Sequence, residues 1–163
     1  MVYWTGLIIK VICGWLLGWI YLERLQSGDT LAFHLEASRL HELSLQSFSN
    51  YVNELFSFNY PVFKGEARNE LFVKILSVFY ILTYGNYWLT AAILSLISFG
   101  SAWRLVLVIQ GCCPELTLAA IISFLFLPSV VFWSSGILKD TLIFSGICYL
   151  ISVALDYHSS EKS

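Results

Sequence analysis

Two acidic residues are candidates for chemistry because each lies a few residues from a long apolar stretch. Asp29 follows the first such stretch in Ser27-Gly28-Asp29-Thr30, and Asp140 follows Lys139 just before the last one. A carboxylate beside a membrane surface could take a proton from a hydroxyl group or hold a divalent ion. Each acid also has a structural interpretation, since Asp near a helix start satisfies or attracts free backbone N–H groups.

Basic and imidazole side chains supply the other candidates. Lys139 could contact a phosphate or reach lipid headgroups, and Lys64 and Arg68, four residues apart, could clamp a lipid phosphate or be ordinary interface charges. His34 and His41 share a helical face, but a zinc pair normally needs closer spacing or another nearby ligand, so no zinc site is expected. Sequence signatures of serine hydrolases, P-loops, zinc proteases and dinucleotide sites are missing.

The composition places these residues in a membrane protein. Of 163 residues, 58% are hydrophobic and 12% charged, with a mean hydropathy of +0.73. A soluble domain carries about 25% charged residues, so this chain could not cover its apolar surface by folding alone. The net charge of −2, without a Lys/Arg cluster, argues against nucleic acid as a partner. The four cysteines form no CxxC and are read as small hydrophobes.

Apolar stretches predict an all-α, polytopic helical bundle without a sheet. The first two are about long enough to cross a bilayer, the third is expected to cross back and to bend or end around Pro128, and the fourth is the last apolar segment. Lys10, near the start of the first span, is expected to snorkel to the membrane surface. The predicted spans cover residues 4–22, 87–109, 116–133 and 141–155.

The polar region 23–86 is predicted to be a loop with amphipathic surface helices, one of them near residues 45–56. Residues 71–86 are apolar but short for a span and contain Lys74, which favours an interfacial position. In that case two crossings separate Asp29 and Asp140, and both face the same side. If 71–86 crosses instead, the two acids face opposite sides.

Several segments together resemble a known family. The first apolar stretch followed by "GDT", the stretch "ARNELFVKILSVFYILTYGNYW" and the block "FLPSVVFWSSGILKDTL" are similar to the N-terminal half of GT-C type membrane glycosyltransferases. The nearest branch is the protein mannosyltransferase and aminoarabinose transferase-like proteins. The resemblance implies that both acidic motifs lie on the extracytoplasmic face and that a polyprenyl-phosphate-linked sugar is the donor.

The same resemblance implies roles for individual residues. Asp29 matches the first-loop acid that serves as catalytic base or metal contact, and Asp140 matches the second-loop acid. Lys64 or Arg68 would stabilise the phosphate leaving group. The resemblance assigns no role to Lys139. Lys139 and His34 are nevertheless candidate substrate-binding residues, and a divalent metal is a candidate cofactor.

We therefore expect a GT-C-like module that transfers a sugar to a hydroxyl acceptor, in a bacterial inner (plasma) membrane. Family members continue through further helices, so the 163-residue chain would be a truncated relative, part of a split enzyme or inactive alone. The alternative is a non-enzymatic membrane protein, or a subunit that packs against a membrane partner. Membrane lipid is a partner in either case.

Overall fold

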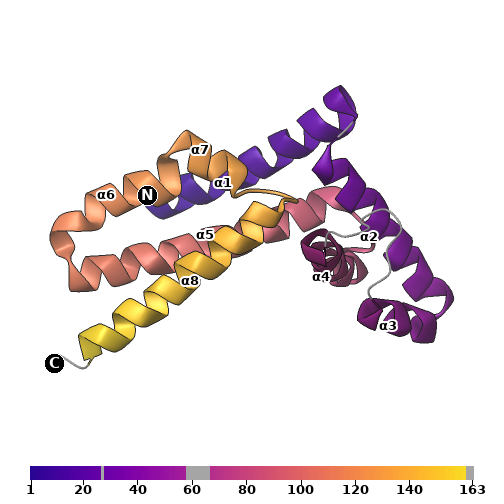
Figure 1. Ribbon diagram of the computed structural model, residues 1–163. Coiled ribbons are helices and arrows are strands. Elements are labelled where there is room, and N and C mark those ends of the chain that lie inside the picture. The colour runs from indigo at the N-terminus through magenta and orange to yellow at the C-terminus, as the bar shows by residue number, and fades with distance from the viewer. Residues whose placement is uncertain (27, 58–66, 161–163) are drawn as a thin grey trace. The chain divides into compact units, whose positions relative to one another are not determined.

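The computed structural model describes residues 1–26, 28–57 and 67–160, and these form helices joined by short connections (Figure 1). About 90% of the described residues are helical, and no strand occurs among them. The prediction of an all-α fold is confirmed.

Three helices in the described part of the chain are long and apolar enough to cross a membrane. The first is α1 (Val2–Trp19), which continues through the π-helical turn Ile20–Leu25. The others are α5 (Tyr87–Cys112) and α8 (Lys139–Ser160). They coincide with three of the four predicted spans.

The fourth predicted span, 116–133, is not one continuous helix. It is a continuous helical segment of changing helix type up to Phe126, followed after Leu127 by the short helix α7, and the bend between α6 and α7 can be followed in Figure 1. Leu127 is extended, with φ −64° and ψ 116°, because the ring of Pro128 disfavours helical geometry in the preceding residue. The pieces are Pro114–Leu116, α6 (Thr117–Ile121), Ile122–Phe126 and α7 (Pro128–Trp133).

This interruption bears on the expected topology. The continuous apolar helix from Pro114 to Phe126 is shorter than the roughly 20 residues that a span requires. Two crossings between Asp29 and Asp140 would therefore need the bent α6–α7 segment to serve as the second crossing. Only α5 has the length of a span between these two acids in the part of the chain that is described.

The chain folds into two compact units. One, called here the spanning unit, contains Met1–Leu17 and Ala91–Ser163; the other, the loop unit, contains Gly18–Thr90. A cluster of buried side chains from α5, α6 and α8 forms a core in the spanning unit, and Tyr3 packs edge-on against Phe99 and Trp103 with ring centroids 5.1 Å apart. The buried members of this core are Phe99, Ala102, Leu105, Val106, Ala120, Leu125 and Cys148.

Helix α8 has small residues inside and large apolar residues outside. Its buried stripe recurs every three to four residues, whereas Ile143, Ile147 and Leu150 are exposed. In lipid, small inward-facing residues let helices approach closely while apolar side chains face the hydrocarbon, so this pattern suits a membrane helix. The buried stripe consists of Thr141, Ser145, Cys148 and Ser152.

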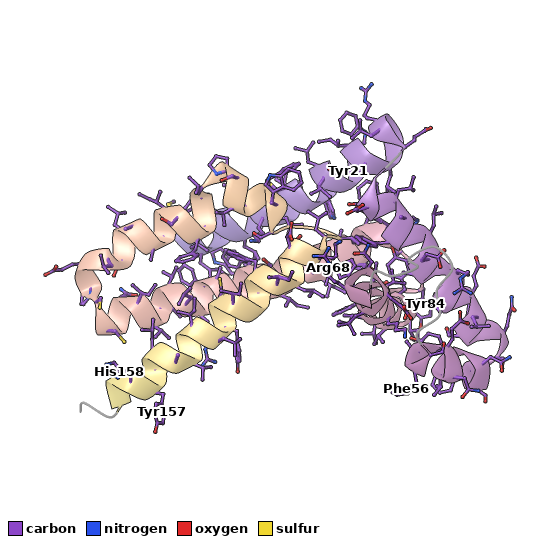
Figure 2. The ribbon with its side chains drawn as sticks, in the orientation of Figure 1. Tyr21, Phe56, Arg68, Tyr84, Tyr157 and His158 are labelled. Carbon is purple, nitrogen blue, oxygen red and sulfur yellow. The ribbon has the colours of Figure 1, made fainter. Side chains whose placement is uncertain are left out.

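The loop unit packs α2 (Asp29–Gln46) against α4 (Ala67–Thr83) and α3 (Phe48–Phe56). The amphipathic helix predicted near 45–56 corresponds to α3, which begins after Ser47, whose hydroxyl accepts a hydrogen bond from the Asn50 amide at 3.4 Å. Phe48 and Phe56 remain exposed, as a surface-lying helix requires. Phe56 is labelled in Figure 2.

Helix α4, like α8, has polar side chains on its buried face and apolar side chains on its exposed face. Its exposed residues form an apolar stripe of one-turn spacing, while Glu70, Lys74, Ser77 and Thr83 are buried within the loop unit. At 17 residues it falls short of a span of about 20. A short helix with an apolar outer stripe favours the predicted interfacial position. The stripe consists of Leu71, Ile75, Val78 and Leu82.

Candidate functional site

The two candidate acids lie at helix starts, each next to a helix of membrane length. Asp29 is exposed at the first residue of α2, and Gly28 before it has φ +107°, a conformation that favours glycine. Asp140 is exposed at the second residue of α8, after the half-buried Lys139. Both carboxylates lie in the first turn, where the helix dipole favours negative charge.

Asp29 belongs to the loop unit and Asp140 to the spanning unit. A single aqueous site shared by the two carboxylates therefore stays a prediction. The same is true of their role in catalysis, since position at a helix start also accounts for both residues.

The predicted phosphate contacts differ in how far the structure describes them. Arg68, labelled in Figure 2, lies in the first turn of α4 and is exposed. Lys64 lies outside the described residues. An exposed guanidinium at this place is compatible with a lipid phosphate contact and with an ordinary interface charge.

His34, predicted as a substrate contact, is half-buried and hydrogen-bonded within the fold. Its Nδ1 lies 2.6 Å from the Tyr80 hydroxyl, and its ring meets Tyr87 edge-on with centroids 5.3 Å apart. Burial lowers the pKa of His34, which favours the neutral ring. Two further buried hydroxyl oxygens, Thr30 Oγ1 and Tyr87 Oη, have no hydrogen-bond partner in the described structure.

A second polar group in the loop unit is the ion pair of Lys74 and Glu70. The Lys74 Nζ lies 3.2 Å from Glu70 Oε1, and the two side chains are 6% and 7% exposed. The Glu70 oxygen is at ion-pair distance, although the approach lacks the geometry of a hydrogen bond. Lys74 also donates to the backbone carbonyl of Ser57. This lysine therefore joins α4 to the end of α3.

Lys10 is buried inside the spanning unit, contrary to the prediction from the sequence. Its side chain is 1% exposed, and its Nζ donates to Ser134 Oγ at 2.6 Å and lies 4.7 Å from the centre of the Phe144 ring. The expectation that Lys10 snorkels is wrong, because the lysine is on the inward face of α1 rather than the lipid-facing one. The signal that could have shown this is the spacing of Gly6, Lys10 and Gly14, which places the lysine on a stripe of small residues.

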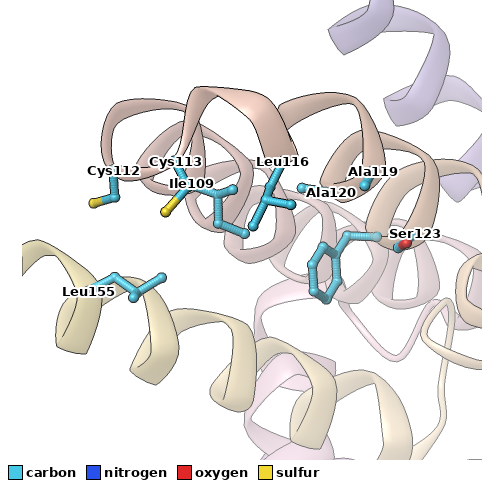
Figure 3. Close-up of a pocket in the computed structure, with 9 residues that line it drawn as sticks. Ile109, Cys112, Cys113, Leu116, Ala119, Ala120, Ser123 and Leu155 are labelled. Carbon is cyan, nitrogen blue, oxygen red and sulfur yellow. The ribbon is translucent and has the colours of Figure 1, made fainter.

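An apolar pocket of about 430 Å³ lies in the spanning unit beside the turn after α5 (Figure 3). Cys112 and Leu155 are among its lining residues, so it adjoins the C-terminal ends of α5 and α8. Asp140, at the opposite end of α8, does not contribute to it. This pocket could take a lipid tail but not the charged group of a substrate bound at Asp140.

The described residues contain no group of three or more His, Cys, Asp or Glu side chains placed to hold a metal ion. Asp29 and Asp140 each offer a single carboxylate. Comparison of the chain with protein-family models, with curated proteins and with solved structures gives no significant match.

Proposed function

We propose that this chain is a membrane-embedded module for glycosyl transfer from a polyprenyl-phosphate-linked sugar. A hydroxyl acceptor attacks the anomeric carbon, Asp29 takes the hydroxyl proton, and the phosphate departs with the electron pair of its bond to the sugar. The observation that carries the proposal is the place of Asp29, which is exposed at the start of a helix directly after the first membrane-length helix. A base at that position meets both the lipid-borne donor and an acceptor from water.

The remaining candidate residues fit roles around that step. Arg68, exposed at the start of α4, and Lys64 offset the negative charge that grows on the departing phosphate. Asp140 acts as the second acid on the same extracytoplasmic side, with Lys139 beside it as a headgroup contact. His34 supports the start of α2 from inside the loop unit, because its hydrogen bond to Tyr80 ties α2 to α4.

The test is Asp29→Asn in protein reconstituted into lipid vesicles. Release of polyprenyl phosphate from radiolabelled polyprenyl-phosphate mannose should fall about 10²- to 10⁴-fold, the usual contribution of a general base. Glu23→Gln is the matched control, since Glu23 is an exposed acid near the end of the membrane-length helix that precedes Asp29. Donor turnover that is unchanged by Asp29→Asn, or equally reduced by Glu23→Gln, would contradict the role of Asp29.

The shared-side arrangement has its own test. Single cysteines at positions 29 and 140 should react with a membrane-impermeant maleimide added from one and the same side of sealed vesicles. Labelling from opposite sides would rule out a site that uses both acids.

A second candidate function is a non-enzymatic subunit of a membrane complex. The observation that favours it is that Lys10, Lys74 and His34 all bond to other groups within the fold and do not line an open pocket. In that case the reconstituted chain shows no donor turnover, and it co-purifies with a membrane partner at a fixed ratio. Asp29→Asn would then change neither property.

A further inference from the structure

The connection between α7 and α8 is buried although it is not helical. This segment, residues 134–138, is called the corner here. Its exposed fractions are 4% at Ser134, 0% at Ser135 and Ile137 and 8% at Leu138. A non-helical backbone inside a membrane protein must have its polar groups satisfied by other parts of the protein.

Two serines of α5 form hydrogen bonds with backbone groups of the corner. The Ser98 hydroxyl donates to the backbone carbonyl of Ser134 at 2.8 Å, and the Gly136 amide donates to the Ser95 hydroxyl at 3.0 Å. Gly136 has φ +69°, so the turn itself needs glycine. Gly14 of α1 lies against it closely enough that a Cβ on Gly14 would approach the Gly136 nitrogen to 3.0 Å.

Lys10 provides the remaining tie, and it holds both sides of the corner. Its ammonium donates to Ser134 Oγ at the first residue of the corner and lies over the Phe144 ring after the corner. Ser134 in turn donates to the Val130 carbonyl, so the hydroxyl both accepts and donates. No carboxylate lies within ion-pair distance of Lys10 among the described residues. The Lys10–Ser134 hydrogen bond has a charged donor, and hydrogen bonds of this kind are among the stronger ones.

We propose that Lys10 is a positioning residue for the start of α8, and through it for Lys139 and Asp140. The helix begins at Lys139, directly after the corner, so the orientation of its first turn follows from where the corner is held. The positional role stands on the geometry of the spanning unit alone. Its consequence for sugar transfer rests on the proposed function.

The experiment uses a cysteine-free full-length chain in vesicles with one of two reporter cysteines. Ser135→Cys reports on the corner and Ser152→Cys on the far part of α8, and both positions are 0% exposed in the native fold. Each reporter is combined with Lys10→Met, with Ser134→Ala and with both changes together. Lys139→Met is the comparison variant, because it removes a half-buried lysine next to the corner, whereas Lys10 is fully buried.

Lys10→Met should raise the rate of N-ethylmaleimide labelling at position 135 about 10- to 100-fold and leave position 152 protected, because the corner opens locally. Ser134→Ala should raise the labelling rate at position 135 by a similar factor. The double variant should label no faster than either single variant, because both changes remove the same hydrogen bond between Lys10 and Ser134. Lys139→Met should leave both reporters protected.

Continued protection of position 135 in Lys10→Met would overturn the proposal. So would equal exposure of both reporters, which would show that Lys10 serves general stability. Donor turnover of the same variants separates this inference from the proposed function. Selective opening of the corner with a lower kcat and an unchanged KM supports both, whereas opening in a chain without turnover supports the positioning role and contradicts sugar transfer.

Discussion

The two units each bury a lysine, and they compensate it in different ways. Lys10 of the spanning unit is 1% exposed and Lys74 of the loop unit 5%. Lys74 has a carboxylate partner, Glu70, one turn away on the same helix. Lys10 has a serine hydroxyl 124 residues away along the chain and an aromatic ring.

The difference shows two ways in which an apolar chain stabilises a buried lysine ammonium. A local ion pair neutralises the charge within one helix, but it buries two ions, and removing one leaves the other uncompensated. A hydroxyl and a ring bury only one ion, yet they require helices from distant parts of the sequence to meet. The first route makes the unit sensitive to the loss of either charge, and the second makes it sensitive to close helix packing.

The largest effect should come from Lys74→Met. Glu70 would remain buried without its counter-ion, and breaking a buried pair in this way typically costs about 3–5 kcal/mol of unfolding free energy. Chemical denaturation in detergent micelles measures it. The double variant Glu70→Leu/Lys74→Met should recover most of the loss, and a double variant as unstable as the single one would show that packing rather than charge is responsible.

Gly14→Ala should have the next largest effect, on the spanning unit. The new Cβ would crowd Ser95 Oγ and the backbone of Gly136, and overpacking of this kind costs about 1–3 kcal/mol. Gly100→Ala is the matched control, because nothing lies within 4 Å of its added Cβ and alanine favours a helix interior. Equal stability of the two variants in thermal unfolding would show that close packing of α1 at the corner is not required.

A smaller effect should separate the two tyrosines near His34. Tyr80→Phe removes the hydrogen bond to His34 and should cost about 1 kcal/mol. Tyr87→Phe removes a buried hydroxyl that has no hydrogen-bond partner in the described structure, so stability should stay the same or rise. A loss in Tyr87→Phe as large as in Tyr80→Phe would show that the Tyr87 hydroxyl is satisfied in solution.

The smallest effect should be a pH dependence confined to the loop unit. Burial lowers the pKa of His34 in the folded chain, whereas an unfolded histidine titrates near pH 6.5. The unfolded state therefore binds more protons, and stability should be complete above about pH 6.5 and fall as the pH drops below it. His34→Gln should flatten this dependence in denaturation measured from pH 5 to 8, and an unchanged slope would assign it to another group.

Several features could be predicted because they depend on local composition. Three membrane-length helices follow from the apolar stretches, and the helix-start interpretation of Asp29 and Asp140 agrees with their places in α2 and α8. The bend expected around Pro128 is present, and it divides the predicted span 116–133 at Leu127. A proline restricts the residue before it, and Leu127 leaves the helix accordingly.

The functional interpretation could be predicted less well, because a carboxylate near a membrane has the same sequence pattern whether it caps a helix or takes a proton. His34 illustrates this point. Its spacing from His41 placed it on a helical face, but only the packing of α2 on α4 showed that its ring contacts Tyr80.

The sequence by itself determined the helical fold and the three long apolar helices, since each of these depends on which residues are neighbours along the chain. The tertiary structure decided where the charges of Lys10 and Lys74 lie. A lysine in an apolar helix either reaches for water or turns inward, and the choice depends on whether another helix presents an acceptor at its face. Ser134 presents that acceptor to Lys10 because α7 ends beside α1.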